Sequence, residues 1–141
     1  WNGSSWTSTN ALNTSTTGSP MGGTISSGYS ATTWGGGGAN PTANTQSWNG
    51  TSWSASTNVS TASRMPNGDG NSNTNFFMVG GTSSDTDRSE IWNGSSWSAG
   101  VTFDGTGTQT GRGSAGAGSG STNFIGFNGS IGFGNQWQLI T

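Results

Sequence analysis

Three acidic residues close together in the sequence form the only group that could serve as a general acid and base. Asp85, Asp87 and Glu90 flank Arg88, and two carboxylates at a suitable separation can cleave a glycosidic bond. The chain has no His, Cys or Lys, so it lacks the parts for nucleophile–base pairs, zinc sites and Schiff-base chemistry. The same spacing is typical of an exposed charged turn, and Asp104 stands alone in a glycine-rich stretch. We therefore expect no catalytic residues and no enzymatic activity.

A second segment has the spacing of a metal-binding loop. Residues 67–73 alternate oxygen-bearing side chains in the way that calcium loops do. The sixth place holds Ser72 instead of glycine, and the twelfth holds Met78 instead of a bidentate glutamate. Asn and Gly are also the usual residues of ordinary turns. We expect a turn here, with no metal and no cofactor.

Glycan chemistry has two possible sites in this chain. The first is N-linked attachment, which requires Asn-x-Ser/Thr. This pattern occurs at Asn2, Asn13, Asn49, Asn58, Asn93 and Asn128. The second is recognition of surface glycans by exposed tryptophan faces, although periodic tryptophans are more often core residues. Both remain predictions.

The elements that must position these residues follow from a phrase repeated along the chain. Trp-Asn-Gly-Ser/Thr-Ser-Trp begins at Trp1, Trp48 and Trp92, at intervals of 47 and 44 residues, and Trp137 follows 45 residues later. A period of this size indicates a solenoid, a propeller or an array. We expect repeats over residues 1–47, 48–91 and 92–136, with 137–141 starting a fourth.

Each period contains about four short strands. In the middle copy, the apolar run 75–79 is followed by a polar stretch and then by Ile91-Trp92, Asn93-Gly94 and Ser96-Trp97. Asn-Gly between two β-prone segments predicts a hairpin with both residues at positive φ, which places Trp92 opposite Trp97. Runs such as 31–34 and small-residue segments such as 21–25 and 113–118 supply the other strands. No helical periodicity occurs, so we expect an all-β fold of tandem four-stranded antiparallel units or propeller blades.

The Gly-Gly pair followed by Trp about a dozen residues later resembles the kelch repeat. It occurs as Gly36-Gly37 before Trp48 and as Gly80-Gly81 before Trp92. The Trp-Asn-Gly-x-Ser-Trp phrase is similar to kelch-like repeats of phage fibre and tail proteins and of bacterial surface proteins. The resemblance covers nearly the whole chain and implies a β-propeller blade. The chain departs from the kelch pattern because the usual strand tyrosine is missing from two copies, and Tyr29 is the only tyrosine present.

The charge of the chain excludes some partners. The net charge is −2, with three scattered arginines, whereas phosphate binding needs clustered basic residues. No apolar run is long enough to span a membrane. Residue 1 is Trp rather than Met, which fits a processed, truncated or mature start. We expect neither nucleic acid nor a membrane span as partner, and a location outside the cell or on a virion surface.

The number of repeats predicts assembly. Closed propellers have four or more blades, whereas this chain offers about three, and its two ends are complementary. Self-association as a homo-oligomer or filament, by strand exchange between chains, would cover the open sheet edges. The alternative is that these residues are an excerpt of a longer chain that carries more blades. The expected packing anchors are Trp1, Trp6, Trp48, Trp53, Trp92, Trp97 and Trp137. We expect a structural, adhesive subunit of a virion fibre or extracellular filament; the alternative is a lectin-like propeller that binds cell-surface glycans.

Overall fold

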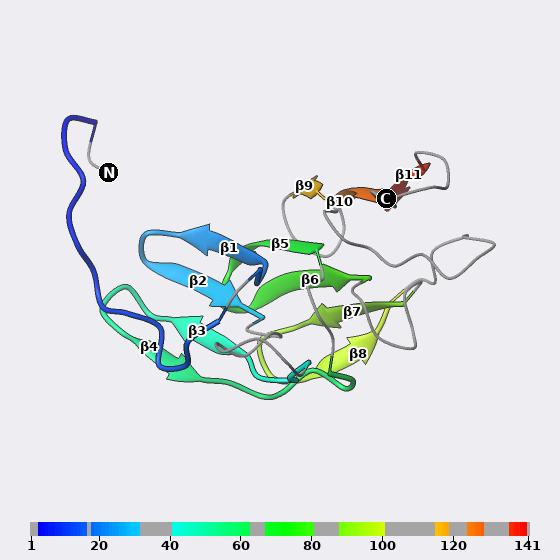
Figure 1. Cartoon of the computed structure of the whole chain (residues 1–141), viewed down its shortest axis with the longest axis horizontal. Helices are drawn as coiled ribbons and strands as arrows, with labels where there is room; N and C mark the ends of the chain where they lie inside the picture. The colour runs from blue at the N-terminus through cyan, green and yellow to red at the C-terminus, as the bar shows by residue number, and fades with distance from the viewer. Residues whose placement is uncertain are drawn as a thin grey trace.

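The computed structural model describes residues 3–16, 18–31, 41–62, 67–80 and 88–100, together with three strands between residues 115 and 140. Within these parts every regular element is a β-strand (Figure 1). The described residues contain no helix that is long and apolar enough to cross a membrane. The prediction of an all-β chain is confirmed.

The strands form antiparallel sheets that follow one another along the chain, and we call them units 1, 2 and 3. Unit 1 has the order β1 (Met21–Thr24), β2 (Ser27–Ser30), β3 (Gln46–Trp48), β4 (Trp53–Ala55). Unit 2 has the order β5 (Asn67–Ser72), β6 (Asn75–Val79), β7 (Ser89–Trp92), β8 (Trp97–Ala99). Unit 3 has the order β11 (Gln136–Ile140), β10 (Phe124–Asn128), β9 (Ala115–Gly118). The two four-stranded sheets confirm the prediction of tandem antiparallel units.

The cross-strand register makes β2, β3 and β4 of unit 1 equivalent residue by residue to β6, β7 and β8 of unit 2. Two sets of partners correspond: Gly28, Trp48 and Trp53 in unit 1, and Phe76, Trp92 and Trp97 in unit 2. The prediction that Trp92 lies opposite Trp97 is therefore confirmed, and the same pairing holds in unit 1.

The hairpin turns at Asn49 and Asn93 are each closed by the asparagine side chain. Asn49 Oδ1 accepts hydrogen bonds from the backbone N–H groups of Thr51 and Ser52, both at 2.9 Å, and Asn93 repeats these bonds. The Asn49 N–H donates to the Ser52 carbonyl, so the central residues of the turn are Gly50 and Thr51. This corrects the prediction that Asn and Gly are the central pair. The asparagine side chain replaces a backbone acceptor, as in other Asx turns.

The turn glycines pack against the neighbouring turn of the same unit. Gly94 has φ +96°, and a Cβ at this position would lie 3.0 Å from Thr74 Cβ. Gly3 has nearly the same φ, +95°, with nothing within 4 Å. Gly94→Ala is expected to destabilise the protein by about 1–2 kcal/mol through φ strain and further through the contact with Thr74. Gly3→Ala is the matched control for the φ strain. Equal midpoints of urea unfolding for the two variants would contradict the packing contribution.

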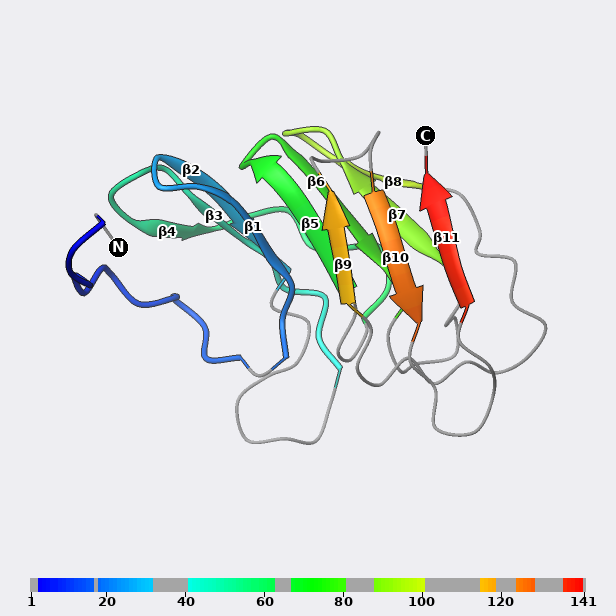
Figure 2. The ribbon, with the colours of Figure 1, turned by 90° about the horizontal axis from the view of Figure 1, so that it is seen from above.

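The inner strands of neighbouring units lie side by side. In Figure 2, β1, β5 and β9 follow one another across the molecule, and β5 contacts both of the other two. A Cβ on Gly22 would lie 2.4 Å from the backbone nitrogen of Gly70. Only glycine at residue 22 allows the backbones of β1 and β5 to approach this closely.

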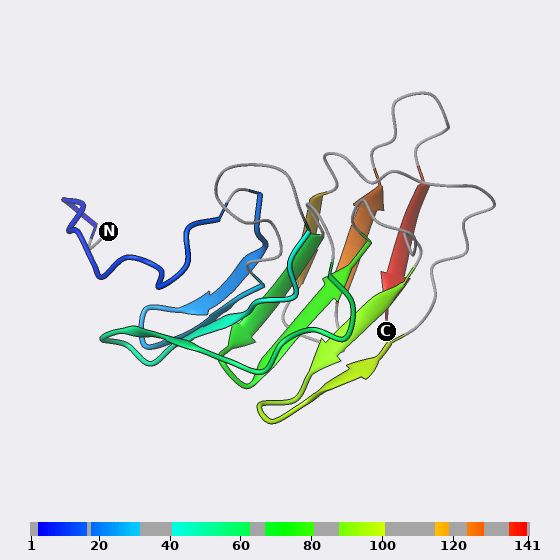
Figure 3. The ribbon, with the colours of Figure 1, turned by 60° about the horizontal axis from the view of Figure 1, so that its bottom comes forward.

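The main core lies between units 1 and 2. Tyr29, on β2, is fully buried and contacts the rings of Phe76, Trp92 and Trp97 at centroid distances of 5.3, 5.2 and 5.8 Å. A second cluster lies on the other face of unit 2, where Phe77 and Val79 are buried with Ile91 against them. Figure 3 shows unit 3 behind unit 2. Unit 1 thus buries one face of its sheet against unit 2, and β5 of unit 2 contacts β9 of unit 3.

The register of unit 3 differs from the sequence expectation at Trp137. Ile140 lies opposite Phe124, as Trp92 lies opposite Phe76, whereas Trp137 lies opposite Phe127. Trp137 is therefore at the other end of β11 from the position of the hairpin tryptophans. Residues 136–140 join the third sheet through this pairing.

Candidate functional site

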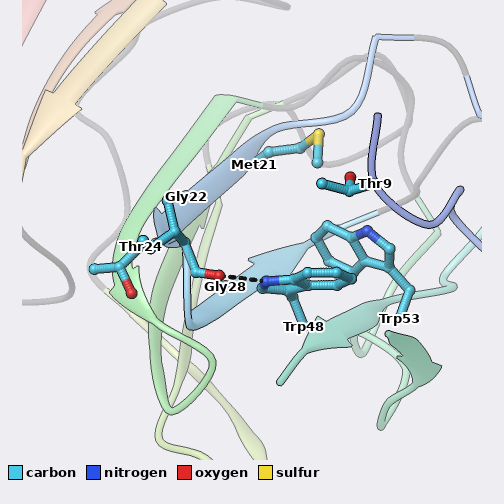
Figure 4. A pocket seen from close by; sticks show the side chains of 9 residues that line it. Thr9, Met21, Gly22, Thr24, Gly28, Trp48 and Trp53 are labelled. Carbon is cyan, nitrogen blue, oxygen red and sulfur yellow. Dashed lines mark hydrogen bonds between the residues drawn. The ribbon is translucent and has the colours of Figure 1, made fainter. Parts of the chain in front are cut away.

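An open groove lies on the face of unit 1 that points away from unit 2. Its volume is about 340 Å³, and it lies between Trp48, Trp53, the strand β1 and Thr9 (Figure 4). The groove continues onto apolar surface, because Met21 is 51% and Ile25 is 91% exposed. Gly28 forms part of its floor. We call this surface the head face: Met21, Ile25, Gly28, Trp48 and Trp53.

The two tryptophans of the head face are held in place. The Trp48 indole N–H donates a hydrogen bond to the Ile25 carbonyl at 2.9 Å, and the Trp48 and Trp53 rings lie 5.5 Å apart at 44°. The equivalent bond in unit 2 runs from Trp92 to the carbonyl of Asn73, also at 2.9 Å. Both carbonyls belong to the first residue of the turn between the two inner strands of the unit. The same hydrogen bond therefore orients the indole rings of Trp48 and Trp92 in both units.

The equivalent surface in unit 2 is covered. There, Trp92 and Trp97 lie 5.6 Å apart, and the ring of Tyr29 from unit 1 is tilted against Trp92 and meets Trp97 edge-on. Unit 2 also has Phe76 where the head face has Gly28. In unit 1 the equivalent pair lines an open groove instead, with Trp48 buried and Trp53 half-buried.

The hydroxyl of Tyr29 fixes this interface. It donates to Thr45 Oγ1 at 2.8 Å and lies 3.0 Å from Ser56 Oγ. Thr45 Oγ1 in turn donates to the carbonyl of Thr57 at 2.8 Å, and Trp97 donates to the same carbonyl. The network joins both units and the segment that connects them.

Burial raises the pKa of the Tyr29 phenol above its ordinary value of 10.0. Because the folded pKa lies above the unfolded one, the stabilisation is fully present below pH of about 10 and is lost as pH rises through the folded pKa. Tyr29 is the only tyrosine, so tyrosinate absorbance reports this residue alone. We expect a native titration midpoint above 10 that returns to about 10 in denaturant. Identical midpoints in the two conditions would refute the burial argument.

In units 1 and 2, a buried side chain holds the segment that precedes the unit. In unit 1 the side chain of Gln46, 1% exposed, accepts a hydrogen bond from the Asn13 N–H at 2.6 Å. In unit 2 the carboxylate of Glu90, 3% exposed, accepts one from the Ser60 N–H at 2.8 Å. Gln46 and Glu90 share one register position. Residues 13–14 therefore dock on unit 1 as residues 60–61 dock on unit 2.

Glu90 does not lie in the exposed charged loop that the sequence predicted. It belongs to β7, forms an ion pair with Arg88, and is buried. Arg88 also donates to the Thr61 carbonyl at 2.6 Å. Alternation along the strand places residues 88 and 90 on the same face, so the pair ties the segment between units to β7. Asp85, Asp87 and Asp104 lie outside the described residues.

The segment with calcium-loop spacing is a strand and not the predicted turn. Residues 67–72 form β5, paired with β6, and the turn comes only at residues 73–74. Among the described residues, no three acidic side chains gather in one place.

The predicted packing anchors divide into covered and exposed positions. Trp48 and Trp92 are buried, Trp53 and Trp97 are half-buried, and Trp6 is 81% exposed. Trp6 therefore does not act as a core anchor within this chain, and residues 3–15 contain no strand, unlike the predicted first hairpin. Trp1 and the side chain of Trp137 lie outside the described residues.

The predicted glycosylation sites on described side chains are exposed. Asn13, Asn49, Asn58 and Asn93 all lie at the surface. The side chains of two of them already close turns, and Asn13 Nδ2 donates to the Trp53 carbonyl at 2.9 Å. Asn2 and the side chain of Asn128 lie outside the described residues. Attachment of glycan remains a prediction.

Models of known protein families give no match to this chain, and a search of curated proteins gives none either. The resemblance to kelch-like repeats remains a prediction that depends on the residues themselves.

Proposed function

We propose that this chain is a non-enzymatic structural and adhesive subunit of a virion fibre or extracellular filament, built of kelch-like blades. The subunits associate through β-strand complementation between chains. The observation that carries the proposal is the open groove lined by Trp48 and Trp53 in unit 1, whose equivalent surface in unit 2 is covered by a neighbouring unit.

The N-terminal segment supports complementation by a strand. Residues 13–14 lie on Gln46 as residues 60–61 lie on Glu90 and Arg88, which gives residues 6–8 the same place in the repeat as Trp53–Ala55. That equivalent is the fourth strand of unit 1, whereas unit 3 has three strands in its described part. Trp6–Ser8 of one chain would complete the third sheet of another by pairing with β11.

The backbone hydrogen bonds that flank the β3–β4 pair predict which residue of the added strand donates its N–H to β11. The Asn49–Ser52 and Thr45–Ser56 pairs both form backbone hydrogen bonds, so by alternation Ser54 also directs its N–H at β3. Its equivalent is Thr7. Thr7→Pro removes this donor and is expected to reduce the assembled protein to monomers.

Ser8→Pro is the matched control, because the alternation directs the N–H of residue 8 away from β11. Light scattering and electron micrographs of the wild type, Thr7→Pro and Ser8→Pro measure the outcome. A monomeric wild type would refute the proposal of assembly. Assemblies that withstand Thr7→Pro would refute pairing by this strand.

A lectin-like function is the second candidate, favoured by the shape of the head face. Gly28 leaves room beside Trp48, and the hydroxyls of Thr9 and Thr24 lie at the groove with two indole faces. Aromatic faces of this kind stack on sugar rings. Titration with surface polysaccharides should quench tryptophan fluorescence in the wild type and not in Gly28→Phe. An unchanged wild-type signal would exclude this candidate.

A further inference from the structure

One face of unit 3 carries apolar residues at the positions that form the covered cluster of unit 2. Ile125, Phe127 and Leu139 have the cross-strand partners expected of Phe77, Val79 and Ile91, shifted by 48 residues. Alternation adds Trp137, the partner of Phe127, to the same face. We call this the tail face: Ile125, Phe127, Trp137 and Leu139.

Units 1 and 2 turn the residues at these same positions toward the unit that follows. In unit 1 the position of Phe77 is taken by Tyr29, which covers the tryptophan pair of unit 2. In unit 2, Phe77 is fully buried and Val79 is 8% exposed. By register, Ile125 is the third member of this series.

The head face is the other half of the same interface. Unit 2 receives Tyr29 on Trp92 and Trp97, and the head face presents Trp48 and Trp53 at those register positions. Asn73 of unit 2, which contacts Ser27 of unit 1 at 2.9–3.0 Å, has Ile25 as its equivalent turn residue. The exposed Ile25 and Met21 therefore border the site where a preceding unit would lie.

We propose that the head face of one chain docks on the tail face of a second copy of the same chain, so that unit 3 stacks on unit 1 as unit 1 stacks on unit 2. Ile125 of one copy takes the place of Tyr29, against Trp48 and Trp53 of the other. The occupant is a second copy because the interface continues the stacking already present within the chain. This inference rests on the proposed assembly and specifies its surfaces.

The two faces lie at opposite ends of the molecule. Figures 2 and 3 show unit 2 between unit 1 and unit 3. A contact between two different faces is heterologous, and it produces a ring or an open filament. Blocking either face should therefore stop growth, whereas two differently blocked chains should still pair once.

The test uses one variant for each face. Ile125→Asp blocks the tail face, and the double variant Met21→Asp with Ile25→Asp blocks the head face at two exposed positions. Ser54→Asp adds the same charge at an exposed position of β4 and serves as the control. Light scattering gives the mass of each protein alone and of an equimolar mixture of the two blocked variants, and circular dichroism shows that each is folded. Ile125→Ser provides a milder tail variant should the aspartate disturb unit 3.

We expect each blocked variant to be monomeric, the mixture to have twice the monomer mass, and the control to assemble like the wild type. A folded blocked variant that keeps the wild-type mass overturns the head-to-tail interface but leaves assembly itself standing. A mixture that remains monomeric, or that regains the full wild-type mass, also overturns it. A monomeric wild-type protein would instead refute the proposed function, because it would show that the chain does not assemble.

Discussion

Gly22→Ala is expected to destabilise the protein by at least about 3 kcal/mol, the upper range for overpacking a well-packed site. The added Cβ would lie 2.4 Å from the Gly70 nitrogen and 2.7 Å from the Gly70 carbonyl oxygen. Both are backbone atoms of the adjoining unit, which cannot move without separating β1 from β5. Against a total stability of about 5–15 kcal/mol for a typical domain, this loss would release unit 1 from unit 2.

Gly28→Ala is the matched control for this change. Its Cβ would meet the Gly22 carbonyl oxygen at 3.2 Å and Trp48 Cβ at 3.5 Å, contacts that small shifts relieve. Urea denaturation followed by tryptophan fluorescence gives both stabilities. The argument requires that Gly22→Ala be the less stable variant by about 2 kcal/mol or more; similar losses would show that the close approach of β1 and β5 is not rigid.

The repeat and its hairpins could be predicted from the sequence because their signals are local. Trp-Asn-Gly-x-Ser-Trp combines a turn with two flanking β-prone residues, and the structure pairs Trp48 with Trp53 and Trp92 with Trp97. The identity of the central turn residues was predicted wrongly. The side chain of Asn49 supplies an acceptor that the backbone would otherwise supply, and backbone propensity alone does not include this contribution.

The small-residue segments predict the inner strands β1 and β9, whereas the composition of β5 resembles that of turns and predicts a turn. Residues 67–72, Asn-Gly-Asp-Gly-Asn-Ser, form β5 through pairing with β6 and close contact with β1. Small residues are required there by the approach of neighbouring backbones, a tertiary effect that overrides local propensity. The short strand β2 also has no apolar run, and its one large residue, Tyr29, fills the interface with unit 2.

The head face could not be predicted from the residue pattern, because units 1 and 2 share that pattern and differ in what covers it. Trp48 and Trp92 both begin the Trp-Asn-Gly-x-Ser-Trp phrase, yet one lines an open groove and the other is covered by Tyr29. The difference depends on Gly28 standing where unit 2 has Phe76, and on which unit lies next. The sequence does contain one signal for the docking of the preceding segments. Gln46 and Glu90 both stand two residues before the repeated Trp, and a polar residue that recurs at one place in the repeat indicates a structural role.

Glu90→Ala is expected to destabilise the protein by about 3–5 kcal/mol, because removing one partner of a buried ion pair leaves the other charge uncompensated. Arg88 would lose its carboxylate, and the Ser60 N–H would lose its acceptor. Unit 1 achieves the same docking without charge, since its equivalents of Arg88 and Glu90 are Asn44 and Gln46. The double variant Arg88→Asn with Glu90→Gln copies that neutral arrangement, and we expect it to recover most of the loss, to within about 1 kcal/mol of wild type.

Urea unfolding of wild type, both single variants, the double variant and Glu90→Ala gives the coupling free energy of the pair. Ser60 and Thr61 belong to the segment that joins unit 1 to unit 2, so loss of the pair should also lower the cooperativity of unfolding by letting the units separate. A double variant as unstable as Glu90→Ala would show that charge, and not a hydrogen-bond acceptor at this register position, holds the segment. Recovery in the double variant would instead identify a buried acceptor as the feature that fastens each preceding segment, Gln46 with residues 13–14 included.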